Sequence, residues 1–80
     1  MKLKNVDELN GFLNAVDKCE KDVYLVSREG DKLNLKSLFS RYISMGRLLS
    51  EEGENLELFC DSRSDEKNFF EFFRAFPGVA

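Results

Sequence analysis

The 80-residue sequence contains no histidine and no tryptophan, a single proline and only two cysteines. The lack of histidine excludes phosphohistidine chemistry, histidine-ligated metal sites and the commonest general acid–base catalyst. The two cysteines, Cys19 and Cys60, lie far apart and do not make a disulfide-rich scaffold, so we expect a cytoplasmic location. No apolar run approaches the roughly 18 residues of a membrane span, and no secretory signal opens the sequence. We therefore expect no membrane partner.

The composition is typical of one small globular domain, which we expect to span residues 1–80. A hydrophobic fraction of 42 % with eight phenylalanines is enough for one core. The formal net charge of −3 is unevenly divided, with +2 in residues 1–50 and −5 in residues 51–80. Because this asymmetry builds no continuous basic stripe, we expect no nucleic-acid partner.

Apolar residues at helical spacing predict a first helix over residues 6–19. Asn5 precedes it as an N-cap and Glu8 follows three residues later, an Asn version of the capping box. Lys2–Lys4, before this cap, is expected to form a very short strand. Gly11 should weaken the helix by roughly 1 kcal/mol relative to Ala without breaking it. The apolar face comprises Val6, Leu9, Phe12, Leu13, Val16 and Cys19.

A β-hairpin and a second helix are predicted next. Asp22–Ser27 and Lys32–Lys36 have the composition and alternation of strands, and Gly30 between them suits the positive φ of a tight turn. A helix is expected from about Leu38 to Leu48 or Leu49. Its apolar stripe comprises Leu38, Phe39, Tyr42, Met45 and Leu49, with Arg41 and Arg47 on the solvent side.

The last third of the chain predicts a strand and a third helix. Asn55–Asp61 alternates, with Leu56, Leu58 and Cys60 on one face. Ser62 or Ser64 is expected to cap the final helix, which Pro77 should end. Its first turn carries Asp65 and Glu66, and its apolar stripe comprises Phe69, Phe72, Phe73 and Phe76, bordered by Phe70.

These elements give the order βαββαβα. The tight hairpin makes the sheet at least partly antiparallel, and the three helices must bury their apolar stripes against it. The expected fold is therefore α+β, a two-layer open-faced sandwich. It has a four-stranded, mainly antiparallel sheet with three helices on one face.

Several segments at these positions are similar to one known family. Together they resemble HPr, the histidine-containing phosphocarrier of the bacterial phosphotransferase system, over roughly residues 19–73. The resemblance rests on the joint order and spacing of the segments and implies the same fold. The segments that carry it are Asp22–Leu25, Asn34–Phe39, Ile43–Gly46, Leu56–Asp61 and Ser64–Glu66.

The N-terminal region departs from the HPr pattern. The family carries its phosphorylated histidine in a loop before the first helix, and here only about five residues precede that helix. Asp7 and Glu8 place negative charge where the family holds a phosphoryl group, and an acidic helix start repels phosphate. We therefore expect a non-catalytic member of the family, not an enzyme.

Ser37 matches the regulatory serine that a dedicated kinase phosphorylates in the HPr family. A phosphate there would meet the N–H groups of a helix start, with Lys36 next to it in sequence. The alternative is that Ser37 only caps the second helix, contributing about 1 kcal/mol.

Leu38, Phe39 and Tyr42 match the surface through which HPr proteins dock onto partners, with Arg41 and Arg47 as a basic rim. This interpretation predicts that at least two of the three apolar residues are partly exposed. The alternative is that they belong to the core. If the family role holds, the partner is a kinase or a transcriptional regulator of carbon metabolism.

Other polar clusters have structural explanations. With no histidine to activate a thiolate, both cysteines are expected to be inert thiols. The acidic residues of 51–54 and 65–66 are expected to be a solvated loop and helix-start charges, so neither a metal nor a cofactor is predicted. Two functions remain open. One is a non-catalytic, HPr-like regulatory module, and the other is a small assembly subunit without a link to sugar transport.

Overall fold

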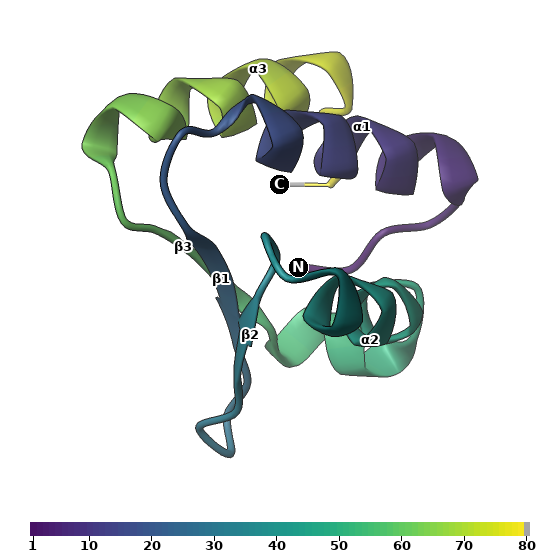
Figure 1. The fold of residues 1–80 in the computed structure, drawn as a ribbon. Helices are drawn as coiled ribbons and strands as arrows, with labels where there is room; N and C mark the ends of the chain where they lie inside the picture. The colour runs from purple at the N-terminus through teal and green to yellow at the C-terminus, as the bar shows by residue number, and fades with distance from the viewer. Residues whose placement is uncertain (80) are drawn as a thin grey trace.

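The computed structural model describes residues 1–79 and has an α+β fold, as the sequence predicts (Figure 1). In chain order its elements are α1 (Val6–Lys18), β1 (Val23–Val26), β2 (Lys32–Asn34), α2 (Leu38–Leu48), the 3₁₀ helix η1 (Glu51–Asn55), β3 (Glu57–Cys60), the 3₁₀ helix η2 (Arg63–Asp65) and α3 (Glu66–Ala75). The helices and the hairpin therefore lie where the sequence pattern places them, with ends that differ by a few residues.

The sheet has three antiparallel strands in the order β2-β1-β3. Tyr24 in the central strand lies between Asn34 on one side and Phe59 on the other. Gly30 in the hairpin has φ of +92°, the positive value that the tight turn requires. The prediction of four strands is wrong within the described residues, because the expected first strand does not join the sheet.

The N-terminal segment is drawn into the core instead of pairing with a strand. The Leu3 N–H donates to the Leu48 carbonyl at 2.8 Å, and the Leu3 side chain is 1 % exposed. The Met1 amine donates to the carbonyls of Gly53 and Leu56. A Cβ on Gly53 would lie 2.8 Å from the Leu48 carbonyl oxygen, so this approach requires glycine. Lys2–Lys4 alternates like a strand, but burial of Leu3 determines its path.

Helices α1 and α3 pack side by side and antiparallel (Figure 1). The Phe12 ring contacts those of Phe69 and Phe72, with centroids 5.7 and 5.8 Å away. Gly11 lies at this contact, and a Cβ there would come within 2.6 Å of the Phe76 ring. The glycine that weakens α1 locally therefore lets α3 approach closely.

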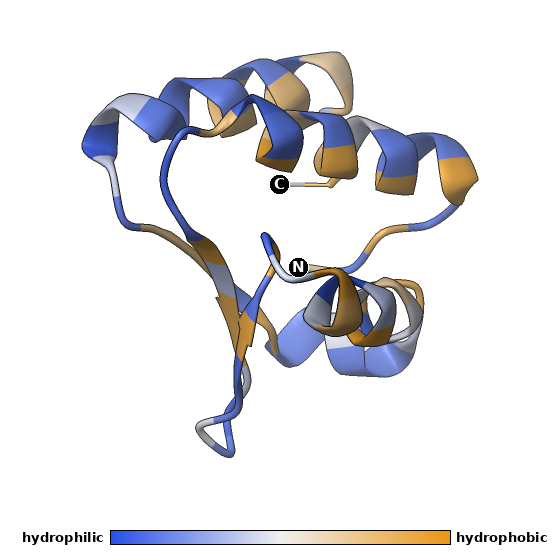
Figure 2. Cartoon of the chain, viewed as in Figure 1, coloured by the Kyte–Doolittle hydropathy of each residue, from blue (hydrophilic) through white to orange (hydrophobic). Residues whose placement is uncertain are grey.

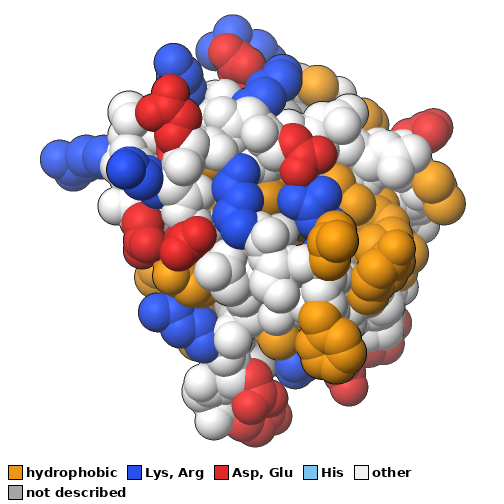
Figure 3. All heavy atoms as spheres, viewed as in Figure 1, with side chains coloured by type: hydrophobic (Ala, Val, Ile, Leu, Met, Phe, Trp, Pro, Cys, Tyr) orange, Lys and Arg blue, Asp and Glu red, His pale blue; other side chains and the backbone are white. Residues whose placement is uncertain are grey.

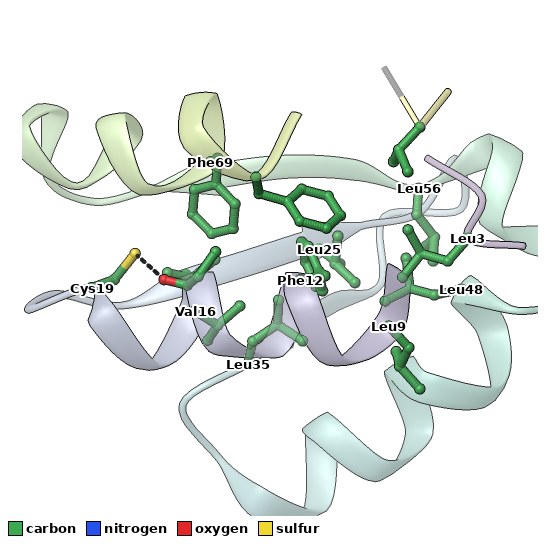
Figure 4. Close-up of a cluster of buried hydrophobic side chains, with 14 residues drawn as sticks. Leu3, Leu9, Phe12, Val16, Cys19, Leu25, Leu35, Leu48, Leu56 and Phe69 are labelled. Carbon is green, nitrogen blue, oxygen red and sulfur yellow. Dashed lines mark hydrogen bonds between the residues drawn. The ribbon is translucent and has the colours of Figure 1, made fainter. Parts of the chain in front are cut away.

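One core joins all three helices to one face of the sheet (Figure 4). Val23 and Leu25 in β1 are fully buried, whereas Tyr24 and Val26, which alternate with them, are only half-buried. Hydrophobic residues along α1 lie on the side that faces the interior (Figure 2). The core residues come from α1, β1, α2, α3 and the segments next to β2 and β3, and they include Leu3, Leu9, Phe12, Leu35, Leu48, Leu56 and Phe69.

The start of α1 differs in detail from the expected capping box. The Asn5 side chain accepts the Glu8 N–H at 2.9 Å, as predicted. The Glu8 carboxylate, however, accepts the Lys4 N–H at 2.7 Å, one residue before the cap. Val6, expected on the buried face, is 62 % exposed, because it lies in the first turn beyond the edge of the core.

Candidate protein-binding surface

Helix α2 directs most of its large apolar residues to solvent. Leu38, Phe39 and Tyr42 are 70 %, 75 % and 72 % exposed. Hydrophobic side chains gather over this helix on the surface (Figure 3). Together with the more shallowly exposed residues on the same side they form a patch that we call the α2 face. The α2 face comprises Leu38, Phe39, Tyr42, Ile43 and Leu49.

The exposure that the docking interpretation predicts is confirmed for all three residues, and the core alternative is wrong. Leu48 faces the interior, fully buried. Ser44 also faces inward at 0 % exposure, and its hydroxyl donates to the Ser40 carbonyl at 2.7 Å. The helix thus satisfies its buried hydroxyl within its own backbone, so this polar residue can face the core while larger apolar residues face water.

Arg41 and Arg47 do not form the exposed basic rim that was predicted. The Arg41 guanidinium donates to the Leu35 carbonyl at 3.1 Å and pairs with Asp17 at 2.7 Å. Arg47 pairs with Glu52 at 3.2 Å and approaches Asp31 at 3.9 Å. Their side chains are only 20 % and 23 % exposed. Both arginines therefore fix the rotation of α2 and leave the α2 face uncharged.

Ser37 precedes α2 in extended backbone, but its hydroxyl caps nothing. Its N–H donates to the Asn34 carbonyl at 3.0 Å, and its carbonyl accepts the Arg41 N–H at 2.9 Å. The side chain makes no cap hydrogen bond and the residue is exposed. The prediction of a hydroxyl cap is therefore wrong, because the backbone alone closes the first turn. The hydroxyl is accessible.

The Lys36 ammonium is engaged elsewhere. It donates to the carbonyls of Val16 and Cys19 at 2.8 and 2.6 Å, at the C-terminal end of α1. These carbonyls carry the negative end of the helix dipole, so a cation there is stabilising. Although Lys36 is adjacent to Ser37 in sequence, its ammonium stabilises the end of α1 and makes no hydrogen bond to the Ser37 hydroxyl.

Gly46 lies on the exposed side of α2 without any internal contact that requires it. A Cβ there would meet no atom within 4 Å. Glycine inside a helix costs roughly 1 kcal/mol relative to Ala, and α2 continues past it to Leu48. Because Gly46 has no side chain, nothing projects from the surface of α2 at this position, between the apolar side chains of the α2 face.

The cysteines are free and are not set up as nucleophiles. The Cys19 thiol donates to the Ala15 carbonyl at 3.3 Å (Figure 4) and accepts from the Asn68 amide. Burial raises the pKa of the Cys19 thiol, and burial raises that of Cys60 to about 11. At neutral pH both are thiols, as expected.

Neither a metal centre nor a membrane span is found in residues 1–79. No three cysteine or acidic side chains lie together there as a metal site requires. None of the helices described is long and apolar enough to cross a bilayer.

Asp65 has a structural role that the sequence did not reveal. The residue is 4 % exposed, and its carboxylate accepts the N–H groups of Lys21 and Glu20 at 2.9 and 3.0 Å. These hydrogen bonds lower the pKa of Asp65. Its expected role was a helix-start charge. Instead it joins the turn before β1 to the start of α3, and no motif signals such a long-range contact.

Comparison of the chain with protein families, with curated proteins and with solved structures finds no match.

Proposed function

We propose that this chain is a non-catalytic, HPr-like protein-binding module that recognises its partner through the α2 face. The observation that carries the proposal is the exposure of Leu38, Phe39 and Tyr42 on one side of a helix whose other side is firmly anchored. Aromatic residues such as Phe39 and Tyr42 are typical of the small set that dominates binding energy. A contiguous apolar patch exposed to water is typical of a site that binds a partner.

The energetics favour an interaction of modest affinity. Two aromatic side chains at this exposure offer on the order of 300 Å² of surface. At about 25 cal/mol per Å², their burial gains roughly 8 kcal/mol before the cost of association, which is on the order of 4–15 kcal/mol. Because Arg41 and Arg47 are turned inward, the α2 face itself carries no charge. Binding at this face should therefore depend only weakly on salt.

The HPr-like topology is part of this proposal. The hairpin, the second helix and the final strand and helix support it, since they follow the order that the resemblance implies. The three strands would correspond to the last three of the four in the family. Absence of histidine and an acidic start to α1 favour loss of the phosphocarrier step. The proposed setting is the cytoplasm, with the phosphoenolpyruvate-dependent sugar phosphotransferase system.

Regulation at Ser37 is a second element, favoured by the accessible hydroxyl that caps nothing. Phosphate on Ser37 would lie at the first turn of α2, where free N–H groups and the helix dipole favour negative charge. It would also border Leu38 and Phe39 and so change the chemistry of the α2 face. The partner in this scheme is a kinase or a transcriptional regulator of carbon metabolism.

The alternative function, an assembly subunit, would use the same face between two copies of the chain. An uncharged apolar face has no like-charge repulsion to prevent such pairing. Sedimentation velocity over a range of concentrations separates the two. A partner-binding module stays monomeric at the concentrations at which it binds its partner. An assembly subunit associates with itself at those concentrations, and Phe39→Glu abolishes that self-association.

The test uses purified HPr kinase and ATP, with intact mass as the readout. We expect the wild-type chain to gain one phosphoryl group and Ser37→Ala to gain none. Phe39→Ala and Tyr42→Ala should slow the reaction, because they remove the docking contacts. Val6→Ala is the control, since Val6 is 62 % exposed on a different helix and lies in neither binding surface. Phosphorylation elsewhere, or equal slowing by Val6→Ala, would contradict the scheme.

A further inference from the structure

The sheet has an unpaired edge at β3 that lies apart from the α2 face. Strand β3 pairs only with β1, because the sheet order is β2-β1-β3. The segment expected to form a fourth strand, Lys2–Lys4, bonds instead to the carbonyl of Leu48 and packs into the core. In the described residues no strand therefore covers the outer edge of β3.

The register identifies the backbone groups at this edge. The Asp61 N–H donates to the Asp22 carbonyl at 3.0 Å, which makes this a hydrogen-bonded pair of β3 and β1. Since hydrogen-bonded and non-bonded pairs alternate, Phe59 and Glu57 also direct their backbone groups toward β1. Leu58 and Cys60 then direct theirs away from the sheet. Two N–H and two C=O groups are thus available to an added strand.

An apolar groove runs beside this edge, between β3 and α3. Its volume is about 210 Å³, and Leu58, Phe69 and Phe73 are among the residues that line it. Phe59 and Phe70 lie at its rim and are 49 % and 62 % exposed. Side chains of an added strand that face inward would enter this groove, where aromatic and aliphatic surface is available for burial.

Charge selects the occupant of the groove. Glu57 and Asp61 flank Phe59 on the outer face of β3, and Glu66 lines the groove. None of the three forms an ion pair among residues 1–79. A second copy paired antiparallel through Phe59 would place Glu57 opposite Asp61 of the other chain, and like charges directly opposite are destabilising. A strand with basic residues at those positions is favoured instead.

From these observations we propose that the β3 edge binds an extended, basic–apolar segment of a partner protein as an added antiparallel strand. In this bound segment, a basic residue lies opposite Glu57, an aromatic residue opposite Phe59 and a second basic residue opposite Asp61. The two residues between them face Leu58 and Cys60, enter the groove and are apolar. This site is separate from the α2 face and does not depend on the function proposed for that face.

The test titrates the chain with a fluorescein-labelled peptide, Lys-Val-Phe-Val-Lys with capped ends, and follows anisotropy and amide NMR shifts. We expect saturable binding with the largest shifts at Leu58 and Cys60. The charge-reversed peptide, Glu-Val-Phe-Val-Glu, should not bind. N-methylation of either valine, which removes an N–H directed at β3, should abolish binding, whereas N-methylation of the phenylalanine should not.

Protein variants test the charge selection without disturbing the core. Glu57→Lys with Asp61→Lys should weaken binding about tenfold. Glu20→Lys with Glu29→Lys makes the same charge change elsewhere and should weaken it much less. Absence of binding, shifts centred on α2, or equal binding of the charge-reversed peptide would overturn the proposal. A dimer that forms through β3 in sedimentation velocity would also overturn it, because the occupant would then be a second copy.

Discussion

Helix α3 presents Phe69 and Phe72 to the interior, whereas helix α2 presents Phe39 and Tyr42 to solvent. Both helices are amphipathic, and both have aromatic residues three apart in sequence. The phenylalanines of α3 meet Phe12 on α1, a neighbour that runs beside them along its length. Helix α2 has no such neighbour on its apolar side. An apolar stripe therefore identifies a helix but does not by itself say what the stripe packs against.

The polar contacts of α2 explain why it keeps this orientation. Rotation of the helix to bury Phe39 would break the pairing of Arg41 with Asp17 and Leu35, and that of Arg47 with Glu52. It would also withdraw Leu48 from the core. The region around α1 and α3 is held by packed rings, while α2 is held by arginines and one buried leucine. Four substitution experiments can break or sharpen this comparison.

The largest expected difference in stability is between the loss of an aromatic ring from the α1–α3 contact and the loss of one from the α2 face. Phe12→Ala should lower the free energy of unfolding by about 3–5 kcal/mol, because it leaves a cavity among packed rings. Phe39→Ala should change it by less than about 0.5 kcal/mol, because the ring lies in water. Urea unfolding followed by circular dichroism measures both. A large loss for Phe39→Ala would show that the α2 face is part of the core.

The two helical glycines should respond with opposite signs. Gly11→Ala places a Cβ 2.6 Å from the Phe76 ring. Overpacking costs about 1–3 kcal/mol and outweighs the helical gain, for a net loss of about 1 kcal/mol. Gly46→Ala points into open space and should gain about 1 kcal/mol. Thermal unfolding of the two variants side by side is the measurement, and a gain for both would contradict the close packing of α1 on α3.

A smaller effect, confined to acidic solution, is expected from Asp65. The pKa of Asp65 is lowered in the folded state. Its carboxylate therefore contributes fully to the free energy of unfolding at pH values above the unfolded pKa of about 3.9. That contribution is lost as the pH falls through the folded pKa. Asp65→Asn should therefore be less stable at neutral pH and lose less stability on acidification. Urea midpoints from pH 7 to pH 2 test this, with the exposed Asp7→Asn as control. Parallel curves for wild type and Asp65→Asn would refute it.

The smallest effect is expected where the turn between β2 and α2 is joined to the end of α1. Lys36→Met removes the ammonium that binds the carbonyls of Val16 and Cys19 and should cost about 0.3–1 kcal/mol. Hydrogen exchange should accelerate in the last turn of α1, with the α3 amides unchanged. Lys67→Met, on the exposed side of α3, is the matched control. Faster exchange in the last turn of α1 in both variants would mean that the loss of any positive charge weakens this turn, and that the hydrogen bonds of Lys36 to its carbonyls are not the cause.

Much of the fold was predictable because its signals are local. Asn5 and Glu8 at the start of α1, Gly30 in the hairpin and Pro77 after α3 act within a few residues of themselves. The strand count was not predictable in this way. Leu3 suits a strand locally, but the free energy of burying it beside Leu48 depends on residues far along the chain.

The candidate site was predictable only in part. Exposure of Leu38, Phe39 and Tyr42 followed from the family resemblance and is present in the structure. The inward turn of Arg41 had no signal in the sequence, since its partner Asp17 lies in α1. Arg47 pairs with Glu52, which is close along the chain, but the sequence pattern does not show that this pairing turns the arginine away from solvent. The Ser37 hydroxyl likewise belongs to a residue type that usually caps a helix, and only the tertiary structure shows that it makes no cap hydrogen bond.

The sequence alone determined the three helices, the hairpin and the last strand, because the apolar period, the helix caps and the turn glycine act between residues that are close along the chain. It also determined that no imidazole chemistry is available, because histidine is absent. Only the tertiary structure decided that α2 faces its apolar residues outward, that the N-terminal segment leaves the sheet, and that the edge of β3 stays open. The physical reason is that burial and ion pairing are shared between distant residues, so their outcome depends on which surfaces the fold brings together.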